Sequence, residues 1–291
     1  MTIRDIKNQF LDRLQDLYTK EEIDTIFFIL AEKFLHKDKS IIRAGLDESW
    51  SELESAEKHF DYALHQLTLG APYQYIVGET EFLDYKIFVN PAVLIPRPET
   101  EELVEWIKED YTNPDNEFNG SILDIGTGSG AIAIALKDAF PNASVHALDI
   151  SQKALEVAQN NAMYNHTNIT FHKINILKSD LKDLPHFDII VSNPPYIPLS
   201  EKQDMDDNVT QFEPAEALFV PDENPTEFYF QISQLAQDKL RPRGSVYLEI
   251  HQNLMEKTKE IYDMGFGRVS VKKDISDNWR LLRAEQPYTC G

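Results

Sequence analysis

Apolar residues recur at helical spacing over the first 72 residues of the chain. The segments IRDIKNQFLDRL, EEIDTIFFILAEKFL and SWSELESAEKHFDYALHQLTLG place them three or four positions apart, which predicts amphipathic helices. The third predicted helix should end at Gly70, because glycine is typical of helix ends. No strand-like alternation interrupts these segments. We therefore expect residues 1–72 to form a small helical bundle with a core of its own.

The pattern changes over residues 73–98. Two short strand-like runs, Thr80–Phe82 and Lys86–Val89, flank a possible turn. This arrangement predicts a β-hairpin that links the bundle to the rest of the chain. Two prolines then bracket Arg97, and a helix is expected to begin there, with acidic residues in its first turn as the helix dipole favours.

Strand-like and helix-like segments alternate from Ser121 onward. SILDI, SVHALDI, NITFHKI, FDIIVS and SVYLEI are typical of buried strands, and amphipathic segments lie between them. Such alternation predicts a mostly parallel sheet covered by helices on both faces. RVSVKKDI and WRLLRAEQ have no helix between them, so an antiparallel hairpin should close one edge. The fold class is α/β, with residues 99–291 as the sheet domain.

Composition limits the setting in which the chain is expected to work. Hydrophobic residues make up 42% of the 291 positions, enough for a sizeable core. The single cysteine, Cys290, cannot form an internal disulfide, which favours a reducing, cytoplasmic compartment. The N-terminus lacks the apolar stretch of a signal peptide, and no apolar run reaches the ~20 residues that span a bilayer. We expect no membrane association.

Charge changes the picture of possible partners. The chain carries 49 acidic and 28 basic residues, a net charge of −21 that repels phosphate backbones. Solubility alone would also explain this balance, yet it disfavours tight, general binding of nucleic acid. The eight histidines lack metal-ligand spacing, so we expect no metal.

The first candidate site is the glycine-rich stretch DIGTGSGAIAIAL. Asp124 precedes Gly126, Gly128 and Gly130, and a helix of small residues follows. Such a turn lets the backbone approach a ligand closely and directs helix N–H groups at it. The next strand ends in Asp149, nineteen residues after Gly130, where a carboxylate can accept both hydroxyls of a ribose. The order of these features favours a nucleoside-type ligand over a purely structural turn.

Two ligands fit this loop. Gly126, Gly128 and Ala131 satisfy the dinucleotide fingerprint G-x-G-x-x-G/A, so a nicotinamide dinucleotide is one candidate. S-adenosyl-L-methionine is the other. An anion at Asp124 would repel a pyrophosphate, but it could receive the ammonium group of a methionine moiety, which favours S-adenosyl-L-methionine.

The second candidate site is the stretch NPPY, which follows the strand FDIIVS. The carboxyl ends of strands in open α/β sheets are where ligands bind. Since a residue before proline is pushed to extended conformations, Asn193 and Pro194 should be stiff. The Asn193 side-chain oxygen and the Pro194 carbonyl can then accept the two hydrogens of a planar –NH₂ group. Tyr196 offers a flat face for stacking.

This corner suits methyl transfer to a conjugated nitrogen. Such a nitrogen is a poor nucleophile, and two fixed acceptors locate it and favour the positive charge that builds on it during attack. No ionised general base is required at the start. The structural alternative is a Pro-Pro turn that does no more than end a strand.

With both loops in view, the sequence resembles the HemK-type release-factor glutamine methyltransferases. The resemblance covers nearly the whole chain and rests on GETEF with LIPRPETEELVEW, DIGTGSGAIAIAL, SNPPYIP and FEPAEALF. It implies a class I, Rossmann-like methyltransferase domain after a helical substrate-recognition domain. NPPY alone also occurs in DNA adenine and RNA guanine amino-methyltransferases, so an amino-methyltransferase acting on adenine or guanine in nucleic acid is the alternative.

The resemblance also implies ligands and residues. The cofactor would be S-adenosyl-L-methionine, with S-adenosyl-L-homocysteine as product. The substrate would be the glutamine side-chain amide in the Gly-Gly-Gln motif of peptide chain release factors; no nucleic acid is expected, and the protein should be a monomer. The implied amide-binding residues are Asn193, Pro194, Pro195 and Tyr196, with Arg97 near the entrance. The expected cofactor residues are Asp124, Gly126, Thr127, Gly128, Ser129, Gly130, Asp149, Asn175, Ile176 and Asn193.

One departure from the family pattern concerns the adenine end of the cofactor site. The family often has an acidic residue followed by an aromatic one after the third strand, where this chain has Asn175 and Ile176. An asparagine oxygen can still accept from an adenine amino group, and an isoleucine can pack on the ring. Cofactor affinity, rather than cofactor identity, depends on this difference.

Overall fold

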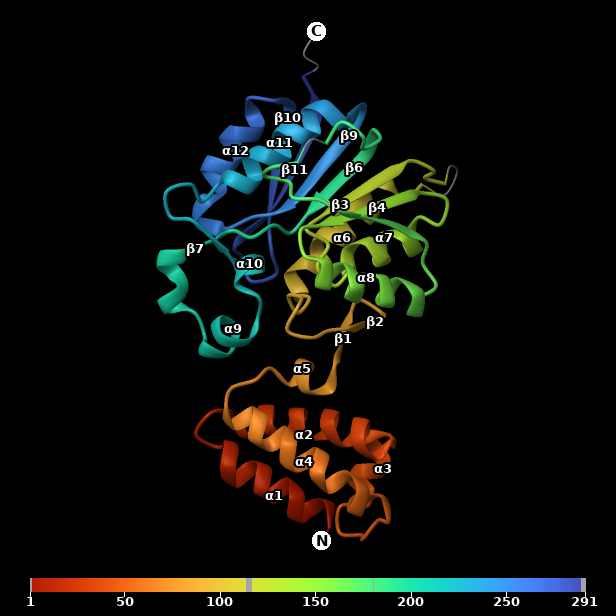
Figure 1. The fold of residues 1–291 in the computed structure, drawn as a ribbon, viewed down its shortest axis with the longest axis vertical. Helices are drawn as coiled ribbons and strands as arrows, with labels where there is room; N and C mark the ends of the chain where they lie inside the picture. The colour runs from red at the N-terminus through yellow and green to blue at the C-terminus, as the bar shows by residue number, and fades with distance from the viewer. Residues whose placement is uncertain (1, 114–116, 180, 289–291) are drawn as a thin grey trace. The chain divides into compact units, whose positions relative to one another are not determined.

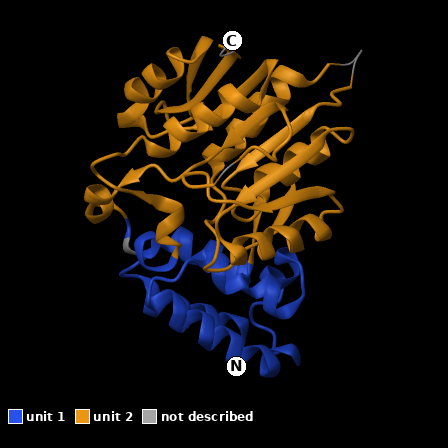
Figure 2. Ribbon diagram, turned by 45° about the horizontal axis from the view of Figure 1, so that its top comes forward, with its two compact units in different colours: residues 1–78, 206–212 blue, residues 79–205, 213–291 orange. Residues whose placement is uncertain are grey.

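The structure is a computed structural model that describes residues 2–113, 117–179 and 181–288 (Figure 1). Cys290 lies outside the described residues. The chain divides into two compact units, coloured separately in Figure 2. The first unit comprises residues 1–78 and 206–212, and the second comprises residues 79–205 and 213–291.

The first unit is helical, as the periodicity predicted. Its helices are α1 (Ile3–Leu14), α2 (Lys20–Leu35), α3 (Lys39–Ala44), α4 (Glu52–Thr68), α5 (Tyr73–Val77) and α9 (Asp207–Phe212). Thr2 and Thr19 begin α1 and α2 with capping boxes that satisfy the free N–H groups of the first turn. Phe10, Phe27 and Phe60 pack ring against ring in the core, with centroids 5.4 to 6.2 Å apart.

The end of the helical unit differs from the expected linker. The predicted hairpin linker begins at residue 73, yet Tyr73–Val77 forms the helix α5. Val77 is buried in the helical core, and Gly78 ends the helix with a left-handed φ of 78°. The hairpin itself is present, formed by β1 (Glu79–Phe82) and β2 (Tyr85–Phe88) as antiparallel partners.

The second unit is built on a seven-stranded sheet, which confirms the predicted α/β fold. Its strand order is β10-β11-β9-β6-β3-β4-β5. The parallel strands are β3 (Ser121–Ile125), β4 (Ser144–Asp149), β5 (Ile169–Lys173), β6 (Phe187–Ser192) and β9 (Leu240–Glu249). The predicted edge hairpin is formed by β10 (Phe266–Lys273) and β11 (Trp279–Pro287), and β11 runs antiparallel to β9.

Helices cover both faces of this sheet (Figure 1). One face carries α6 (Pro98–Tyr111), α7 (Ala131–Ala139) and α8 (Gln152–Tyr164); the other carries α11 (Glu227–Lys239), η2 (Gln252–Leu254) and α12 (Met255–Asp263). Side chains alternate along β9, so Leu248 joins the core beneath α11 and α12 while Tyr247 packs edge-on against Trp106 of α6 at 5.7 Å. The same alternation directs Glu249 toward α6.

Short elements between β6 and α11 were not predicted. They are β7 (Ile197–Pro198), η1 (Leu199–Asp204), α9, α10 (Ala215–Leu218) and β8 (Phe219–Val220). None is long enough to show a helical or strand period, which explains why the sequence pattern missed them. Among the described residues, no helix combines the length and the apolar composition that crossing a bilayer requires.

Candidate active site

A cavity of about 390 Å³ opens at the carboxyl ends of the parallel strands in the second unit. Its wall includes Ile125 from the end of β3, Asp149 from β4 and Ser192 from β6. Eight of the predicted site residues line it: Gly126, Gly128, Asp149, Asn175, Ile176, Asn193, Pro194 and Pro195. The cavity therefore brings the glycine loop and the NPPY stretch to one place, although Gly126 and Asn193 lie 67 positions apart in the sequence.

The glycine loop has a backbone that only glycine adopts without strain. The φ angles of Gly126, Gly128 and Gly130 are +71°, +53° and +84°. No atom lies within 4 Å of a Cβ built on Gly126, so the backbone there faces open space. A Cβ on Gly130 would instead come 3.1 Å from that of Ala158 in α8. Gly126 thus leaves room for a ligand, whereas Gly130 allows close packing.

Four predicted cofactor residues of this loop do not line the cavity: Asp124, Thr127, Ser129 and Gly130. Asp124 is fully buried, and the Thr127 hydroxyl donates to its Oδ2 at 2.6 Å. Its Oδ1 has no hydrogen-bond partner among the described residues, and burial raises its pKa to about 7. In this structure Asp124 stabilises the glycine loop through its hydrogen bond with Thr127, and a contact between Asp124 and the cofactor stays a prediction.

A buried asparagine that the sequence did not single out holds the glycine loop from behind. Asn161 of α8 donates through Nδ2 to the carbonyl oxygens of Ser129 and Phe88, at 2.8 and 2.9 Å. Its Oδ1 accepts from the Phe88 N–H at 2.8 Å. Through Asn161, these hydrogen bonds connect the glycine loop to β2, so the linker hairpin also helps to fix the backbone of the glycine loop.

Asp149 connects the glycine loop to the start of α8. Its two oxygens accept from the backbone N–H groups of Gly128 at 2.9 Å and Ser151 at 2.8 Å. Burial raises its pKa, while these hydrogen bonds and that from Ile150 oppose the rise. The three N–H groups use three of the four lone-pair positions of the carboxylate, so one position remains to accept a ligand hydroxyl in the cavity. Ser151 caps α8 as predicted, accepting from the Ala154 N–H at 3.2 Å.

Asn175 and Ile176 lie in the cavity wall, and their contact with the adenine end of a cofactor stays a prediction. The Asn175 Oδ1 accepts from the Leu177 N–H at 2.9 Å, so this side chain also stabilises the turn after β5. Ile176 is buried and presents an apolar side chain on which a planar ring can pack. The nearby Ile150 is 54% exposed and lines the same cavity.

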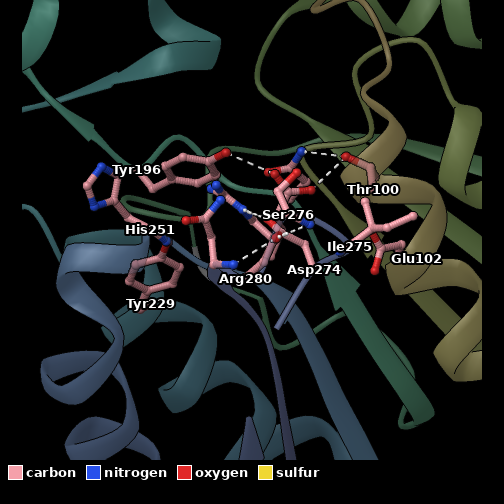
Figure 3. Close-up of polar contacts among 12 residues, drawn as sticks. Thr100, Glu102, Tyr196, Tyr229, His251, Asp274, Ile275, Ser276 and Arg280 are labelled. Atoms are coloured by element: carbon pink, nitrogen blue, oxygen red, sulfur yellow. Dashed lines mark hydrogen bonds and ion pairs between the residues drawn. The ribbon is translucent and has the colours of Figure 1, made fainter. Parts of the chain in front are cut away.

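The NPPY stretch is held by a chain of hydrogen bonds that the sequence did not reveal (Figure 3). Asn193 donates through Nδ2 to Oγ1 of Thr100 at 3.1 Å, and the Thr100 hydroxyl donates to Glu249 Oε2 at 2.6 Å. The Tyr196 hydroxyl donates to the other oxygen, Oε1, at 2.9 Å. Tyr196 is only partly exposed and does not line the cavity, so its stacking on a substrate stays a prediction.

A signal for Glu249 does exist in the sequence. It is the one charged residue in the otherwise apolar run VYLEI, at the carboxyl end of a central strand. Ser192 and Leu248 are partners in the pairing of β6 with β9, so Asn193 and Glu249 occupy the next positions on adjacent strands. Burial raises the Glu249 pKa, and Thr100, Tyr196 and Arg280 oppose the rise.

Arg280, to which the sequence assigned no function, lies beside this cluster. Its guanidinium pairs with the buried Asp274 at 3.2 Å, and Figure 3 shows it below the line from Tyr196 to Thr100. Asp274 also accepts from the N–H groups of Ser276 and Asn278, which fixes the turn between β10 and β11. The edge hairpin thus brings a positive charge to the buried Glu249.

Arg97 does not line the cavity, but it connects two segments that do. It forms an ion pair with the buried Glu213 at 2.5 Å, and Glu213 also accepts from the Ile95 N–H at 3.1 Å. Residues 92–94 precede Arg97 and line the cavity, as do Pro214, Glu216 and Ala217, which follow Glu213. Arg97 therefore has a structural partner, and a direct substrate contact stays a prediction.

The residues present fit a nucleoside-type ligand. The cavity offers open space at Gly126, a carboxylate at Asp149 and apolar walls at Ile150 and Ile176. Within the described ranges, no three histidine, cysteine, aspartate or glutamate side chains gather as metal ligands do.

Comparison with known proteins agrees with this arrangement. Residues 100–217 match the family model described as methyltransferase small domain. A 16S rRNA N2 G1207 methyltransferase of T. thermophilus, solved with AdoMet and guanosine, superposes with a TM-score of 0.52 at 21% identity, over 72% of this chain and 49% of that one. The fold is that of a class I methyltransferase.

Closer relatives specify the family. A release factor glutamine methyltransferase of Flavobacterium psychrophilum is 42% identical, over 97% of this chain and 99% of its own length. One from Bacteroides thetaiotaomicron is 40% identical, over 94% and 96%, and one from Lactococcus lactis is 44% identical, over 75% and 78%. The chain belongs to the release factor glutamine methyltransferase family.

Proposed function

We propose that this protein transfers a methyl group from S-adenosyl-L-methionine to a glutamine side-chain amide in the Gly-Gly-Gln motif of peptide chain release factors. Family membership supports the reaction class. The observation that carries the proposal is the shared cavity, whose wall contains both the glycine loop with Asp149 and the acceptors of Asn193 and Pro194.

The cofactor is proposed to occupy the side of the cavity formed by the glycine loop. Asp149 would accept a ribose hydroxyl, Ile176 would pack on the adenine, and the backbone at Gly126 and Gly128 would face the methionine end. When bound, S-adenosyl-L-methionine supplies a methyl carbon activated by its sulfonium. The remaining catalytic task falls to the residues that hold the amide.

Asn193 and Pro194 are proposed to hold the substrate carboxamide. In the part of the chain that the structure describes, no hydrogen bond occupies the Asn193 Oδ1 or the Pro194 carbonyl oxygen, so both can accept. Two acceptors on one –NH₂ group locate the nitrogen and stabilise the positive charge that it gains in attack. The nitrogen becomes acidic as the N–C bond forms, so no residue has to act as an ionised base beforehand.

The helical unit, residues 1–78 and 206–212, is proposed to recognise the release factor outside its reactive loop. A separate core supports a separate binding role, because that unit can present a fixed surface of its own. We further propose that the protein is cytoplasmic and acts as a monomer. Light scattering of the purified enzyme tests the oligomeric state.

The test is a methylation assay with labelled methyl donor. Intact release factor, the same protein with the Gly-Gly-Gln glutamine replaced by alanine, DNA and ribosomal RNA are supplied separately. Label is expected in the intact release factor only. Label confined to DNA or RNA would establish the alternative amino-methyltransferase and overturn the proposal.

A further inference from the structure

The buried carboxylate of Glu249 decides which way a short chain of hydrogen bonds runs. Both oxygens of Glu249 accept from a neighbouring hydroxyl, and the Thr100 hydroxyl donates its single proton to Oε2, at 2.6 Å. The short distance is typical of a charge-assisted bond. The Tyr196 hydroxyl donates to Oε1 in the same way, which leaves Glu249 nothing to donate.

The direction of the Thr100 bond fixes the amide of Asn193. Since the Thr100 proton is used, Oγ1 of Thr100 has only lone pairs to offer, and the Asn193 Nδ2 donates to it at 3.1 Å. The reverse orientation would set the amide oxygen against these lone pairs. Oδ1 of Asn193 therefore remains as the free acceptor of a side chain that lines the cavity.

We propose that Thr100 and Glu249 are positioning residues for methyl transfer, holding the Asn193 amide with Oδ1 as the acceptor for the substrate –NH₂ group. This inference rests on the proposed function. If the amide turned over, Nδ2 would meet the substrate –NH₂ group, and two donors would face each other. Burial raises the Glu249 pKa, and the positive charge of Arg280 opposes this rise, which favours a carboxylate that accepts from both hydroxyls.

A purely mechanical role is the competing explanation, since Thr100 lies in the first turn of α6 and Glu249 ends β9. The two roles differ in whether Thr100 acts through Asn193. A double-mutant cycle separates them, because residues that act through one another give non-additive effects. The variants are Thr100→Val, which keeps the shape and removes the hydroxyl, and Thr100→Ser, which keeps the hydroxyl.

The cycle measures kcat, the KM for release factor and the cofactor Kd. Thr100→Val and Glu249→Gln should each lower kcat at least ~10-fold with the cofactor Kd within ~2-fold, and Thr100→Ser should stay within ~3-fold. On the Asn193→Ala background, followed under single-turnover conditions, Thr100→Val should cause no further loss. Equal losses on both backgrounds would overturn the inference. Thr258→Val is the matched control, because Thr258 is buried and its hydroxyl has no partner among the described residues.

A second readout does not depend on the substrate. The side-chain –NH₂ signals of Asn193, identified by their loss in Asn193→Ala, should be ordered in the wild type and in Thr100→Ser but averaged in Thr100→Val. Unchanged ordering in Thr100→Val would also overturn the inference. A wild-type enzyme that fails to label release factor refutes the proposed function instead, whatever the side-chain signals show.

Discussion

Single residues in the cavity wall combine a structural role with a proposed ligand-binding role. Asp149 is the clearest example, because its carboxylate accepts from two backbone N–H groups and also faces the cavity. Sequence reasoning placed it at a strand end and derived a ribose contact. It could not derive the bonds to Gly128 and Ser151, which depend on the folded loop.

Replacing Asp149 with alanine should weaken cofactor binding at least ~10-fold. The change removes the expected ribose acceptor and leaves the N–H groups of Gly128 and Ser151 without their partner. Isothermal titration with S-adenosyl-L-methionine measures the effect, and Glu223→Ala is the control because Glu223 is exposed. An affinity equal to that of the control would refute the ribose assignment.

Asp124 should make stability depend on pH. Burial raises its pKa from 3.8 to about 7, so between these values the native state keeps a proton that the unfolded state has released. The free energy of unfolding therefore decreases as pH rises from 4 to 7, by up to ~4 kcal/mol at ~1.4 kcal/mol per pH unit.

Asp124→Asn removes this titration. The free energy of unfolding of the variant minus that of the wild type should be larger at pH 8 than at pH 5. Urea unfolding of both proteins at both pH values measures this difference. Asp238→Asn serves as the control, since the Asp238 side chain is 70% exposed. Parallel pH profiles for Asp124→Asn and the wild type would show that Asp124 ionises normally.

At the level of elements, the turn from β3 into α7 serves packing and, in the proposed function, cofactor binding. Gly126 and Gly130 share a left-handed backbone, with φ angles of +71° and +84°, but their surroundings differ. Alanine at either position carries ~1–2 kcal/mol of backbone strain. Only at Gly130 would the new methyl group also press on Ala158 of α8, at 3.1 Å.

Gly130→Ala should therefore lower the Tm more than Gly126→Ala does. Gly126→Ala should have the larger effect on cofactor Kd, because its methyl group projects into open space at the cavity wall. Calorimetry without cofactor and titration with it measure the two effects. Equal changes in both quantities would contradict this division between packing and binding.

The regular elements of the second unit could be predicted because their patterns are local. The strands from Ser121 to Ser192 and the helix begun by Ser151 lie within a residue or two of their expected bounds. The segment from Ile197 to Val220 could not, since its short elements show no period. The hydrogen bonds that join Thr100 and Glu249 to Asn193 could not be predicted for another reason. They form because β6 and β9 are neighbours in the sheet, and the strand order is not a local property of the sequence.

For the molecule as a whole, two separate hydrophobic cores imply two cooperative units. One core lies within the helical unit and the other between the sheet and its helices α11 and α12. All residues that line the cavity belong to the second unit. A ligand stabilises only the state that binds it, by an amount set by its concentration relative to Kd.

Scanning calorimetry should accordingly resolve two transitions. S-adenosyl-L-methionine should raise the temperature of one transition and leave the other unchanged. Phe27→Ala should lower the second transition and serve to assign it, because Phe27 is fully buried in the helical core. A single peak that moves as a whole with cofactor would show that the units unfold together.

The helix α9 has a consequence for how the protein can be divided. Residues 206–212 interrupt the catalytic portion yet belong with residues 1–78, and Phe212 lies 3.9 Å from a Cβ built on Gly70. The polypeptide thus passes from one portion to the other three times. If residues 1–78 were deleted, residues 206–212 would lose the helices with which they form one unit. A minimal fragment of the second unit therefore needs residues 206–212 replaced by a short loop as well as residues 1–78 removed.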